Sequence, residues 1–527
     1  MTRTKQKQIS LGLLLFFTLN LSPLSNLSAQ DNGQRERRVE ATSQPAARKN
    51  APKTLAELRS AIQEVLNRPE LAPAQVAVKV SSLETGRVIF EENAFKLLHP
   101  ASVMKTYTVA TALDRLTPGF RFKTSVYAKS QPDASGTIRG DLTIYGRGDP
   151  SISARFNNGD YNKSIEDLAS RIKAAGVKHV EGDIVGDESY FTGAPFGFGW
   201  EWADLQWYSG AEVSALSVND NSLDLFIKPG LSIGSQCVIT TGPPTPLVTF
   251  TNRCMTTTRG TKREVSIYRG AGSAVVEVGG NLPIGEPGWT GIISVSRPAL
   301  VFVYMLRASL ARLGVTITGR SRAIDSYERA GVPLETAALA EIASIQSPPL
   351  SDIAAQTLKP SQNLYAELIL RALGTAVRTD PKQTSEQAGI ESVKTFLREA
   401  GGDTNLLVIT DGSGESRRDL VTADSTNRLL IYMDRHRFAK PFREALPVAG
   451  VDGTLKNRMK GTNAENNVRA KTGTLPTIAA LSGYVTSAAG ERLVFSILIN
   501  NYTEESTARR SYIDDIAVLL ASFTGKS

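Results

Sequence analysis

Residues 102–116 read SVMKTYTVATALDRL, and the Ser-x-x-Lys pattern at their start is the feature that decides the fold. The apolar spacing predicts one helix over 102–116, which the Pro-Gly pair at 118–119 would stop. Residues three apart share a helix face, so the Ser102 hydroxyl and the Lys105 amine would lie side by side. A serine attacks a carbonyl only when another group accepts its proton, and a partly desolvated neutral lysine can accept it.

A second pattern, Ser361-Gln362-Asn363, follows a Lys-Pro pair and leads into a helical segment. A Ser two residues before an Asn can project both polar groups from one turn into a cleft. The ordinary alternative is a helix N-cap, because Ser and Asn are both preferred at that position.

A third pattern, Lys471-Thr472-Gly473, lies on a predicted strand over 466–473. Lys and Thr offer an ammonium and a hydroxyl to a carboxylate, and Gly lets a substrate backbone approach the strand closely. The alternative is an edge-strand lysine near a turn.

Each pattern alone is common, so the inference rests on their joint occurrence. Ser-x-x-Lys, Ser-x-Asn and Lys-Thr-Gly occur in this order, which is the signature set of penicillin-binding proteins and serine β-lactamases. The interval between the Ser-x-x-Lys and Ser-x-Asn patterns is long. In this the sequence resembles the class C low-molecular-mass penicillin-binding proteins, the DacB-like D-alanyl-D-alanine carboxypeptidase/endopeptidase family. Other stretches between about residue 55 and the C-terminus resemble the same family: Gly148-Asp149-Pro150, Ser217-Val218-Asn219, Asp411-Gly412-Ser413-Gly414 and Lys471-Thr472-Gly473-Thr474-Leu475.

The resemblance implies an α/β (α+β) fold. A penicillin-binding transpeptidase-like domain, an antiparallel sheet flanked by helices, would carry nested, mainly β inserted domains. The local sequence pattern agrees with an insert, because residues 121–340 are rich in Gly, predicted turns and short predicted strands. The expected division is a signal peptide 1–29, a flexible linker 30–53, domain I 54–120 and 343–527, domain II 121–222 and 286–342, and domain III 223–285.

Local patterns predict further elements. Thr54 and Glu57 form a capping box that begins a helix at 55–66. The last predicted helix carries apolar residues that favour packing on the sheet over an interfacial membrane anchor. The remaining expectations are a hairpin at 76–91, helices at 163–175, 299–313, 385–400 and 506–523, and strands at 406–410, 477–487 and 491–501. Helical patterns also cover 350–373, with an inter-helix turn at residues 361–363.

The resemblance also implies acyl transfer with distinct roles. Ser102 would be the nucleophile that attacks the penultimate D-Ala carbonyl, and Lys105 would be its general base. The nearby cation Lys471 and the exclusion of water would favour the neutral amine. Ser361 would relay the proton to the leaving amine, and Asn363 would hydrogen-bond the substrate amide.

The strand motif is expected to bind the other end of the substrate. Lys471 and Thr472 would hold the terminal carboxylate, with Gly473 beside them. Backbone N–H groups of Ser102 and Thr474 would form the oxyanion hole. The implied partners are peptidoglycan peptides and β-lactam antibiotics.

Family members also contact the diaminopimelate end of the peptide. By motif position this role falls on Asp187 and Phe191 in GDESYF and on Arg417 after DGSG. The alternative for Asp187 and Arg417 is a solvated loop charge. Two residues depart from the family pattern, namely Pro476, where a polar residue can occur, and Glu415, where an apolar residue is frequent.

The N-terminus resembles an export signal. Arg3, Lys5 and Lys7 precede an apolar run at 11–21, and small residues then end at Ala29. This order predicts a secretory signal peptide cut after Ala29, with an uncleaved anchor as the alternative. The run is shorter than the roughly 20 residues of a spanning helix. We therefore expect a periplasmic protein without a transmembrane anchor.

Composition excludes several classes of function. Hydrophobic residues make up 41% and charged residues 21% of the 527 residues, as in ordinary globular proteins. The net charge is +8, but most of the surplus lies within residues 1–53, so no basic face for nucleic acid is expected. Cys237 and Cys254 are the only cysteines, and in an exported protein such a pair favours a disulfide. With three histidines and no Cys/His cluster, neither a metal nor a cofactor is expected.

Three rival functions are weaker. A Ser-His-Asp hydrolase lacks a Gly-x-Ser-x-Gly motif, and no histidine lies in a recognisable motif. A β-lactamase-like hydrolase shares the chemistry, but the long insert argues against it. A catalytically silent peptidoglycan-binding scaffold need not keep all three motifs, and this sequence keeps them all.

Overall fold

The structure is a computed structural model that describes residues 51–502 and 506–527. The predicted signal peptide, and all but the last residues of the predicted linker, lie outside the described residues. Helix α1 (Leu55–Leu66) begins as predicted, since Thr54 Oγ1 accepts a hydrogen bond from Glu57 N at 3.2 Å. The Glu57 carboxylate in turn accepts from Lys53 N at 2.7 Å.

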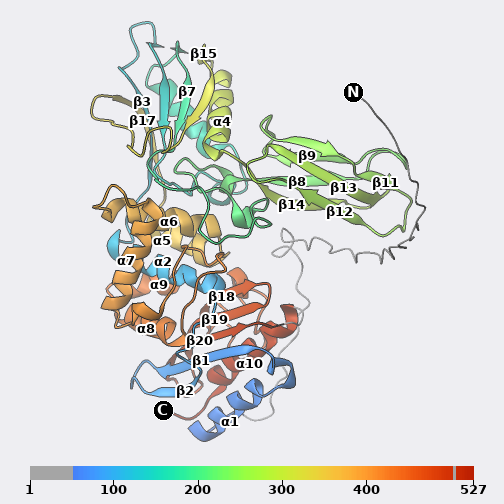
Figure 1. Cartoon of the computed structure of the whole chain (residues 1–527), viewed down its shortest axis with the longest axis vertical. Coiled ribbons are helices and arrows are strands. Elements are labelled where there is room, and N and C mark those ends of the chain that lie inside the picture. Colours follow the sequence, from blue (N-terminus) through green and yellow to red (C-terminus); the bar gives the residue numbers. More distant parts are fainter. Residues whose placement is uncertain (1–50, 503–505) are drawn as a thin grey trace, which may run out of the picture.

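An antiparallel five-stranded sheet forms the centre of one part of the molecule (Figure 1). Its edge strand carries the Lys-Thr-Gly motif, and its middle strands consist almost entirely of buried residues. In spatial order the strands are β18 (Arg469–Leu475), β19 (Ile478–Thr486), β20 (Arg492–Asn500), β1 (Gln75–Ser82) and β2 (Val88–Glu92).

Helices cover both faces of this sheet, because successive strand residues point to opposite sides. Val494 packs in the cluster that contains α2, whereas its neighbour Phe495 packs in the cluster that contains α1 and the C-terminal helix. One face holds α1 and α10 (Ser506–Ser522). The other holds α2 (Met104–Arg115), α5 (Leu350–Leu358), α6 (Asn363–Val377), α7 (Ser385–Glu399), α8 (Ala423–Arg435) and α9 (Ala439–Ala445).

The C-terminal helix packs on the sheet, as its pattern predicts. Ile513, Ile516, Leu520 and Phe523 are all buried in the cluster shared with α1. Within the described residues, no helix combines the length and the apolar character that crossing a bilayer requires.

Between α2 and α5 the chain builds separate sheets with their own apolar cluster. A mixed five-stranded sheet with helices α3 (Lys163–Ala174) and α4 (Pro298–Arg312) stands beyond the helical layer in Figure 1. Its strands are, in order, β16 (Ser321–Ile324), β7 (Ile184–Asp187), β5 (Leu142–Tyr145), β3 (Lys123–Ala128) and β17 (Ala340–Gln346). Beside it, a small parallel sheet joins β15 (Thr316–Ile317), β6 (His179–Val180) and β4 (Thr137–Ile138).

Two further sheets form the all-β region that projects to one side in Figure 1. One joins β14 (Trp289–Ser294), β8 (Ser222–Lys228) and β9 (Val238–Gly242). In the other, β13 (Val275–Pro283) pairs with β10 (Thr249–Asn252), β11 (Met255–Thr257) and β12 (Glu264–Tyr268).

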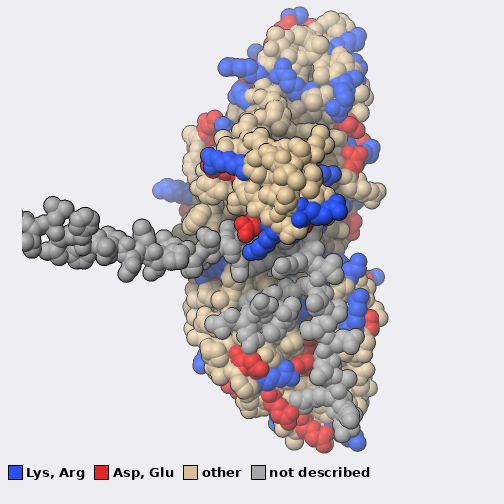
Figure 2. All heavy atoms as spheres, turned by 90° about the vertical axis from the view of Figure 1, so that its right-hand side faces the viewer, with Lys and Arg blue, Asp and Glu red and all other residues tan. Residues whose placement is uncertain are grey.

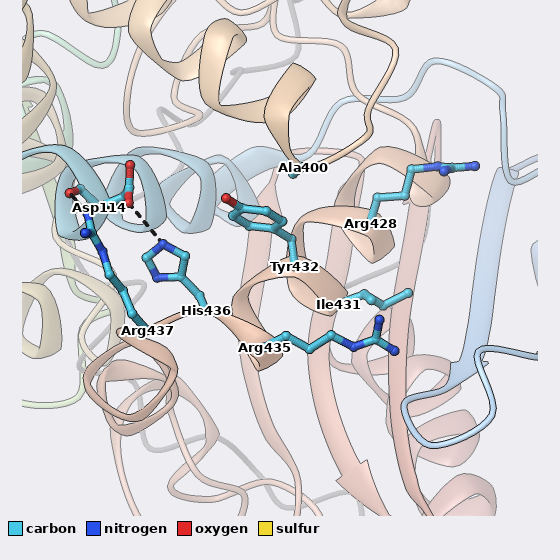
Figure 3. A pocket seen from close by; sticks show the side chains of 8 residues that line it. All are labelled: Asp114, Ala400, Arg428, Ile431, Tyr432, Arg435, His436 and Arg437. Carbon is cyan, nitrogen blue, oxygen red and sulfur yellow. Dashed lines mark hydrogen bonds and ion pairs between the residues drawn. The ribbon is translucent and has the colours of Figure 1, made fainter.

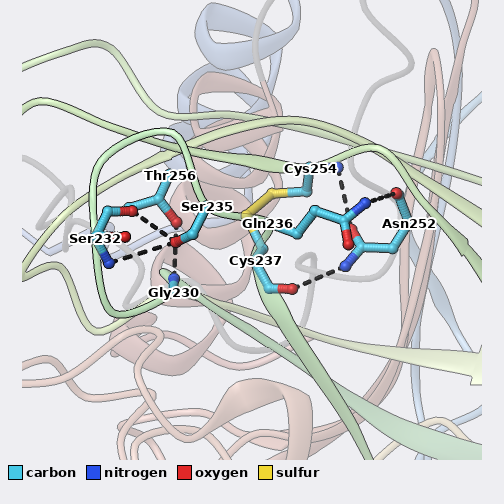
Figure 4. Close-up of a disulfide and its surroundings, with 8 residues drawn as sticks. All are labelled: Gly230, Ser232, Ser235, Gln236, Cys237, Asn252, Cys254 and Thr256. Carbon is cyan, nitrogen blue, oxygen red and sulfur yellow. Dashed lines mark hydrogen bonds between the residues drawn. A yellow bond between two sulfur atoms is a disulfide. The ribbon is translucent and has the colours of Figure 1, made fainter.

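The predicted disulfide between Cys237 and Cys254 links these two sheets (Figure 4). Asn252 holds both cysteines, because its Nδ2 donates to the Cys237 carbonyl at 2.8 Å and its Oδ1 accepts from Cys254 N at 3.1 Å. Both cysteines are buried in the apolar cluster of this region.

One prediction of local structure is wrong. Residues 406–410 form no strand, because Val408 pairs only with Leu420 in an isolated bridge before the chain turns. The helical pattern at 350–373 forms two helices, α5 and α6, and the expected inter-helix turn lies between them, where the chain contains Pro360 and Ser361 has a left-handed φ of +65°. The sequence reading also missed α8 and α9.

On the face shown in Figure 2, basic and acidic side chains lie scattered among larger areas of uncharged surface.

Candidate active site

Ser102 lies in a tight turn at the start of α2. A single 3-10 turn, Ala101–Val103, precedes the helix, so the predicted helix 102–116 is regular only from Met104. Ala101 has φ +46°, a left-handed conformation that non-glycine residues adopt rarely and often at functional sites. Ser102 is partly exposed, and its hydroxyl lies 2.7 Å from Lys105 Nζ. The two side chains therefore lie side by side, as the sequence predicts.

Lys105 ties three segments together. The side chain is fully buried, which is costly for an amine unless polar groups surround it. Besides Ser102 Oγ, its Nζ donates to Asn363 Oδ1 at 2.6 Å and to the Ser413 carbonyl at 2.8 Å. The amine thus lies against the hydroxyl of the first motif, the amide of the second and the DGSG loop.

Asn363 begins α6, and both hydrogens of its amide are bonded within the protein. Nδ2 donates to the Ser209 carbonyl at 3.0 Å and to Glu415 Oε2 at 2.8 Å. An Asn amide has only two N–H donors, so Asn363 can donate to a substrate carbonyl only if one of these contacts opens. The cap of α6 is Gln362, whose Oε1 accepts from Leu364 N at 3.3 Å, so Ser361 is not the side chain that caps this helix.

The third motif supplies a second Ser–Lys pair. Lys471 on β18 is fully buried, and its Nζ donates to Ser361 Oγ at 2.8 Å and to the Thr472 carbonyl at 2.9 Å. The Thr472 hydroxyl lies 2.7 Å from that of Thr454. The sequence reading missed Thr454, for which no motif gave a signal.

Two glycines let the loop and the strand close around the nucleophile turn. A Cβ on Gly473 would lie 2.4 Å from the Pro100 carbonyl oxygen, and one on Gly414 would lie 1.9 Å from that of Ala101. The sequence explained Gly473 by the approach of a substrate. In the structure the close neighbour is the protein's own turn before Ser102.

Gly473→Ala is expected to displace β18 from the nucleophile turn. Overpacking of this kind lowers the free energy of unfolding by about 1–3 kcal/mol. Acylation should slow by about 100-fold, because a shift of about 1 Å at a reacting group costs that much. Thermal unfolding and the rate of penicillin acylation check both effects. Gly119→Ala, where no atom lies within 4 Å of the new Cβ, is the matched control, and equal acylation rates for the two variants would contradict this explanation.

Asp411 shapes the DGSG loop that carries the Ser413 carbonyl. Its buried carboxylate accepts from the backbone N–H groups of Ser413 at 3.1 Å, Gly414 at 2.6 Å and Ser416 at 2.8 Å. Trp200 Nε1 also donates to it at 2.8 Å. These bonds hold the loop in the conformation that directs a carbonyl at Lys105.

The three residues assigned to the far end of the substrate have different surroundings. Asp187 is fully buried on β7, hydrogen-bonds Ser189 and forms an ion pair with Arg329, so the alternative of a solvated charge is wrong for it. Phe191 is buried against Gly148. Arg417 is partly exposed and pairs with the exposed Glu201 at 3.3 Å, in a position that solvent can reach.

A separate hollow lies at the end of α2 away from the motifs (Figure 3). It has a volume of about 730 Å³ and contains none of the motif residues. Its lining residues are Asp114, Ala400, Arg428, Ile431, Tyr432, Arg435, His436 and Arg437. Over the residues that the structure describes, no group of three or more His, Cys, Asp or Glu side chains could hold a metal ion.

The fold and the two Ser–Lys pairs define a serine acyl-transfer enzyme of the penicillin-binding class. Residues 58–523 match the D-Ala-D-Ala carboxypeptidase 3 (S13) family, and the chain belongs to this family. The predicted family and its activity, a serine-type D-Ala-D-Ala carboxypeptidase, are thereby confirmed.

Relatives and solved structures agree with this assignment. The chain is 33% identical to the D-alanyl-D-alanine carboxypeptidase of Actinomadura sp. (strain R39), over 89% of this chain and 86% of the relative. It is 24% identical to the D-alanyl-D-alanine carboxypeptidase DacB of Haemophilus influenzae, over 83% of this chain and 88% of the relative. The crystal structure of penicillin-binding protein 4 (dacB) from Haemophilus influenzae has the same fold, with a TM-score of 0.75 at 23% identity, over 86% of this chain and 97% of that one.

Proposed function

We propose that this chain is an exported carboxypeptidase that removes the terminal D-Ala from peptidoglycan stem peptides through an acyl-enzyme on Ser102. The observation that carries the proposal is the contact of Lys105 Nζ with both Ser102 Oγ and Asn363 Oδ1, at 2.7 and 2.6 Å. This contact places a buried amine where it can accept the serine proton.

In the acylation step, Ser102 Oγ attacks the carbonyl carbon of the penultimate D-Ala. The hydroxyl proton passes to Lys105 Nζ as the new C–O bond forms and the carbonyl electron pair moves to oxygen. The backbone N–H groups of Ser102 and Thr474 are the proposed donors to this oxyanion. When the tetrahedral intermediate collapses, the C–N bond to the terminal residue breaks.

The second Ser–Lys pair is suited to the leaving group. Ser361 gives its proton to the departing nitrogen, and Lys471 Nζ, 2.8 Å from Ser361 Oγ, replaces that proton. The Lys471 and Thr472 side chains are the proposed site of the terminal carboxylate, next to Gly473 on the edge strand. An edge strand can also pair with an extended peptide backbone. Water then attacks the ester on Ser102, the C–O bond to Ser102 breaks, the proton held by Lys105 returns to Ser102 Oγ, and a proton from the water restores the Lys471 ammonium.

β-Lactams are proposed to acylate the same serine, because their strained amide carbonyl takes the place of the peptide carbonyl while their carboxylate takes the place of the C-terminus. Arg417, partly exposed beside the loop, is the proposed contact for the diaminopimelate side chain. For Asp187 and Phe191 we propose an indirect part in this contact, because both are buried. The periplasmic location rests on the export signal in residues 1–29.

Purified protein should release D-Ala from a pentapeptide ending in D-Ala-D-Ala, and intact mass should increase by one penicillin per chain. Digestion of cross-linked muropeptides, followed by mass spectrometry, shows whether the enzyme also cuts cross-links as an endopeptidase. A protein that binds muropeptides without D-Ala release or adduct would be a silent scaffold. Rapid turnover of penicillin without D-Ala release would identify a β-lactamase-like hydrolase.

A further inference from the structure

Glu415 occupies an unusual place for an acidic residue. It lies in the DGSG loop at the position after Gly414, and it is only 8% exposed. Its Oε2 accepts from Asn363 Nδ2 at 2.8 Å, while Asn363 Oδ1 accepts from Lys105 Nζ at 2.6 Å. One amide therefore separates this carboxyl group from the amine that contacts Ser102.

The contact also determines how the Asn363 amide is oriented. A carboxylate accepts hydrogen bonds and cannot donate them, so it requires the Nδ2 end of the amide. The Ser209 carbonyl makes the same demand at 3.0 Å. The Glu415 carboxyl and the Ser209 carbonyl together fix the Nδ2 end of the amide, so Oδ1 faces Lys105 and accepts a hydrogen bond from its Nζ.

The surroundings make this carboxyl group change its charge near neutral pH. The pKa of Glu415 is raised to about 7, chiefly by burial and also by the nearby Asp204 and Asp411, while Lys105 and the bond from Asn363 lower it. These groups come from the segment before Tyr208, from the DGSG loop itself, from α2 and from α6. The influence of Lys105 on Glu415 is reciprocal, so an ionised Glu415 favours the protonated amine.

We propose that Glu415 is a positioning residue of the acyl-transfer site. It orients the Asn363 amide, and its own charge influences whether Lys105 is protonated. This inference rests on the proposed function, since it concerns the same serine and lysine. It deepens that function by adding a residue that regulates how acylation responds to pH.

The sign of the effect follows from the charges. Acylation needs the neutral amine of Lys105, so its rate falls on the acid side as the amine becomes protonated. An ionised Glu415 favours the protonated amine and moves this loss of rate to higher pH. Because the pKa of Glu415 is about 7, the group is ionised only near and above that pH, so removing it should move the part of the acid limb that lies above about pH 7 to lower pH and leave the profile in mild acid unchanged.

The test measures the rate of acylation by a fluorescent penicillin between pH 5 and 9, by in-gel fluorescence. Glu415→Gln keeps the shape and an acceptor oxygen, and the part of its acid limb above about pH 7 should move down by about one pH unit, the scale of a single nearby charge. Glu415→Leu should show the same shift and, in addition, a plateau about 10-fold lower, because one Asn363 N–H loses its acceptor. Glu391→Gln, which removes an exposed carboxylate paired with Arg398 at 3.0 Å, changes the net charge equally and should keep the wild-type profile.

The outcomes separate this inference from the proposed function. A wild-type protein that penicillin does not label contradicts the proposed function, and the inference falls with it. A labelled wild type whose profile coincides with that of Glu415→Gln contradicts the role of Glu415 alone. A thermal unfolding scan confirms that each variant is folded, and a lower plateau without a shifted limb in both Glu415 variants would reduce the residue to a structural contact.

Discussion

Ser102→Ala is expected to abolish both the covalent penicillin adduct and the release of D-Ala. The hydroxyl oxygen is the atom of this residue that forms the covalent bond to the substrate, and loss of a serine nucleophile lowers kcat by about 10⁴-fold or more. Intact mass spectrometry of the protein after incubation with penicillin should show the drug mass on the wild type and an unmodified mass for the variant.

A second serine variant makes this test specific. Ser496 on β20 is fully buried, and its hydroxyl lies 2.9 Å from that of Ser482 on the neighbouring strand. Ser496→Ala should be labelled as fast as the wild type. Equal labelling of Ser102→Ala and the wild type would show that another residue is the nucleophile.

Lys105→Met is expected to slow acylation by about 10³-fold, within the range that a general base contributes. Methionine keeps the length and volume of the side chain but cannot accept a proton. The variant should also lose stability, by about 1–3 kcal/mol, because Asn363 Oδ1 and the Ser413 carbonyl lose a buried donor. The acylation rate and chemical denaturation measure the two effects separately.

Lys79→Met distinguishes catalysis from stability. Lys79 is a buried lysine on β1 that pairs with Asp424 at 2.5 Å, and breaking such a pair costs about 3–5 kcal/mol. The folded fraction of this variant should nevertheless acylate at the wild-type rate. If Lys105→Met and Lys79→Met slowed acylation equally, general-base catalysis by Lys105 would be refuted.

Features that depend on neighbouring residues could be predicted well from the sequence. Thr54 and Glu57 mark the start of α1 because a cap involves groups only three residues apart. Segments 477–487 and 491–501 coincide within a residue with β19 and β20, because long apolar stretches with few breakers favour buried strands. The prediction of a strand at 406–410 is wrong because a strand needs a partner strand, and in this segment Val408 forms only an isolated bridge with Leu420.

The sequence by itself determined the family, since three ordered motifs with their local settings are enough to recognise a serine acyl-transfer site. Only the tertiary structure decided which side chains meet. Asp187 contacts Arg329, which is 142 residues away in the sequence, and Glu415 contacts Asn363, which is 52 residues away. The physical reason is that caps, turns and strand patterns depend on short-range geometry, whereas contacts such as these are produced only when the whole chain packs, and no local pattern encodes them.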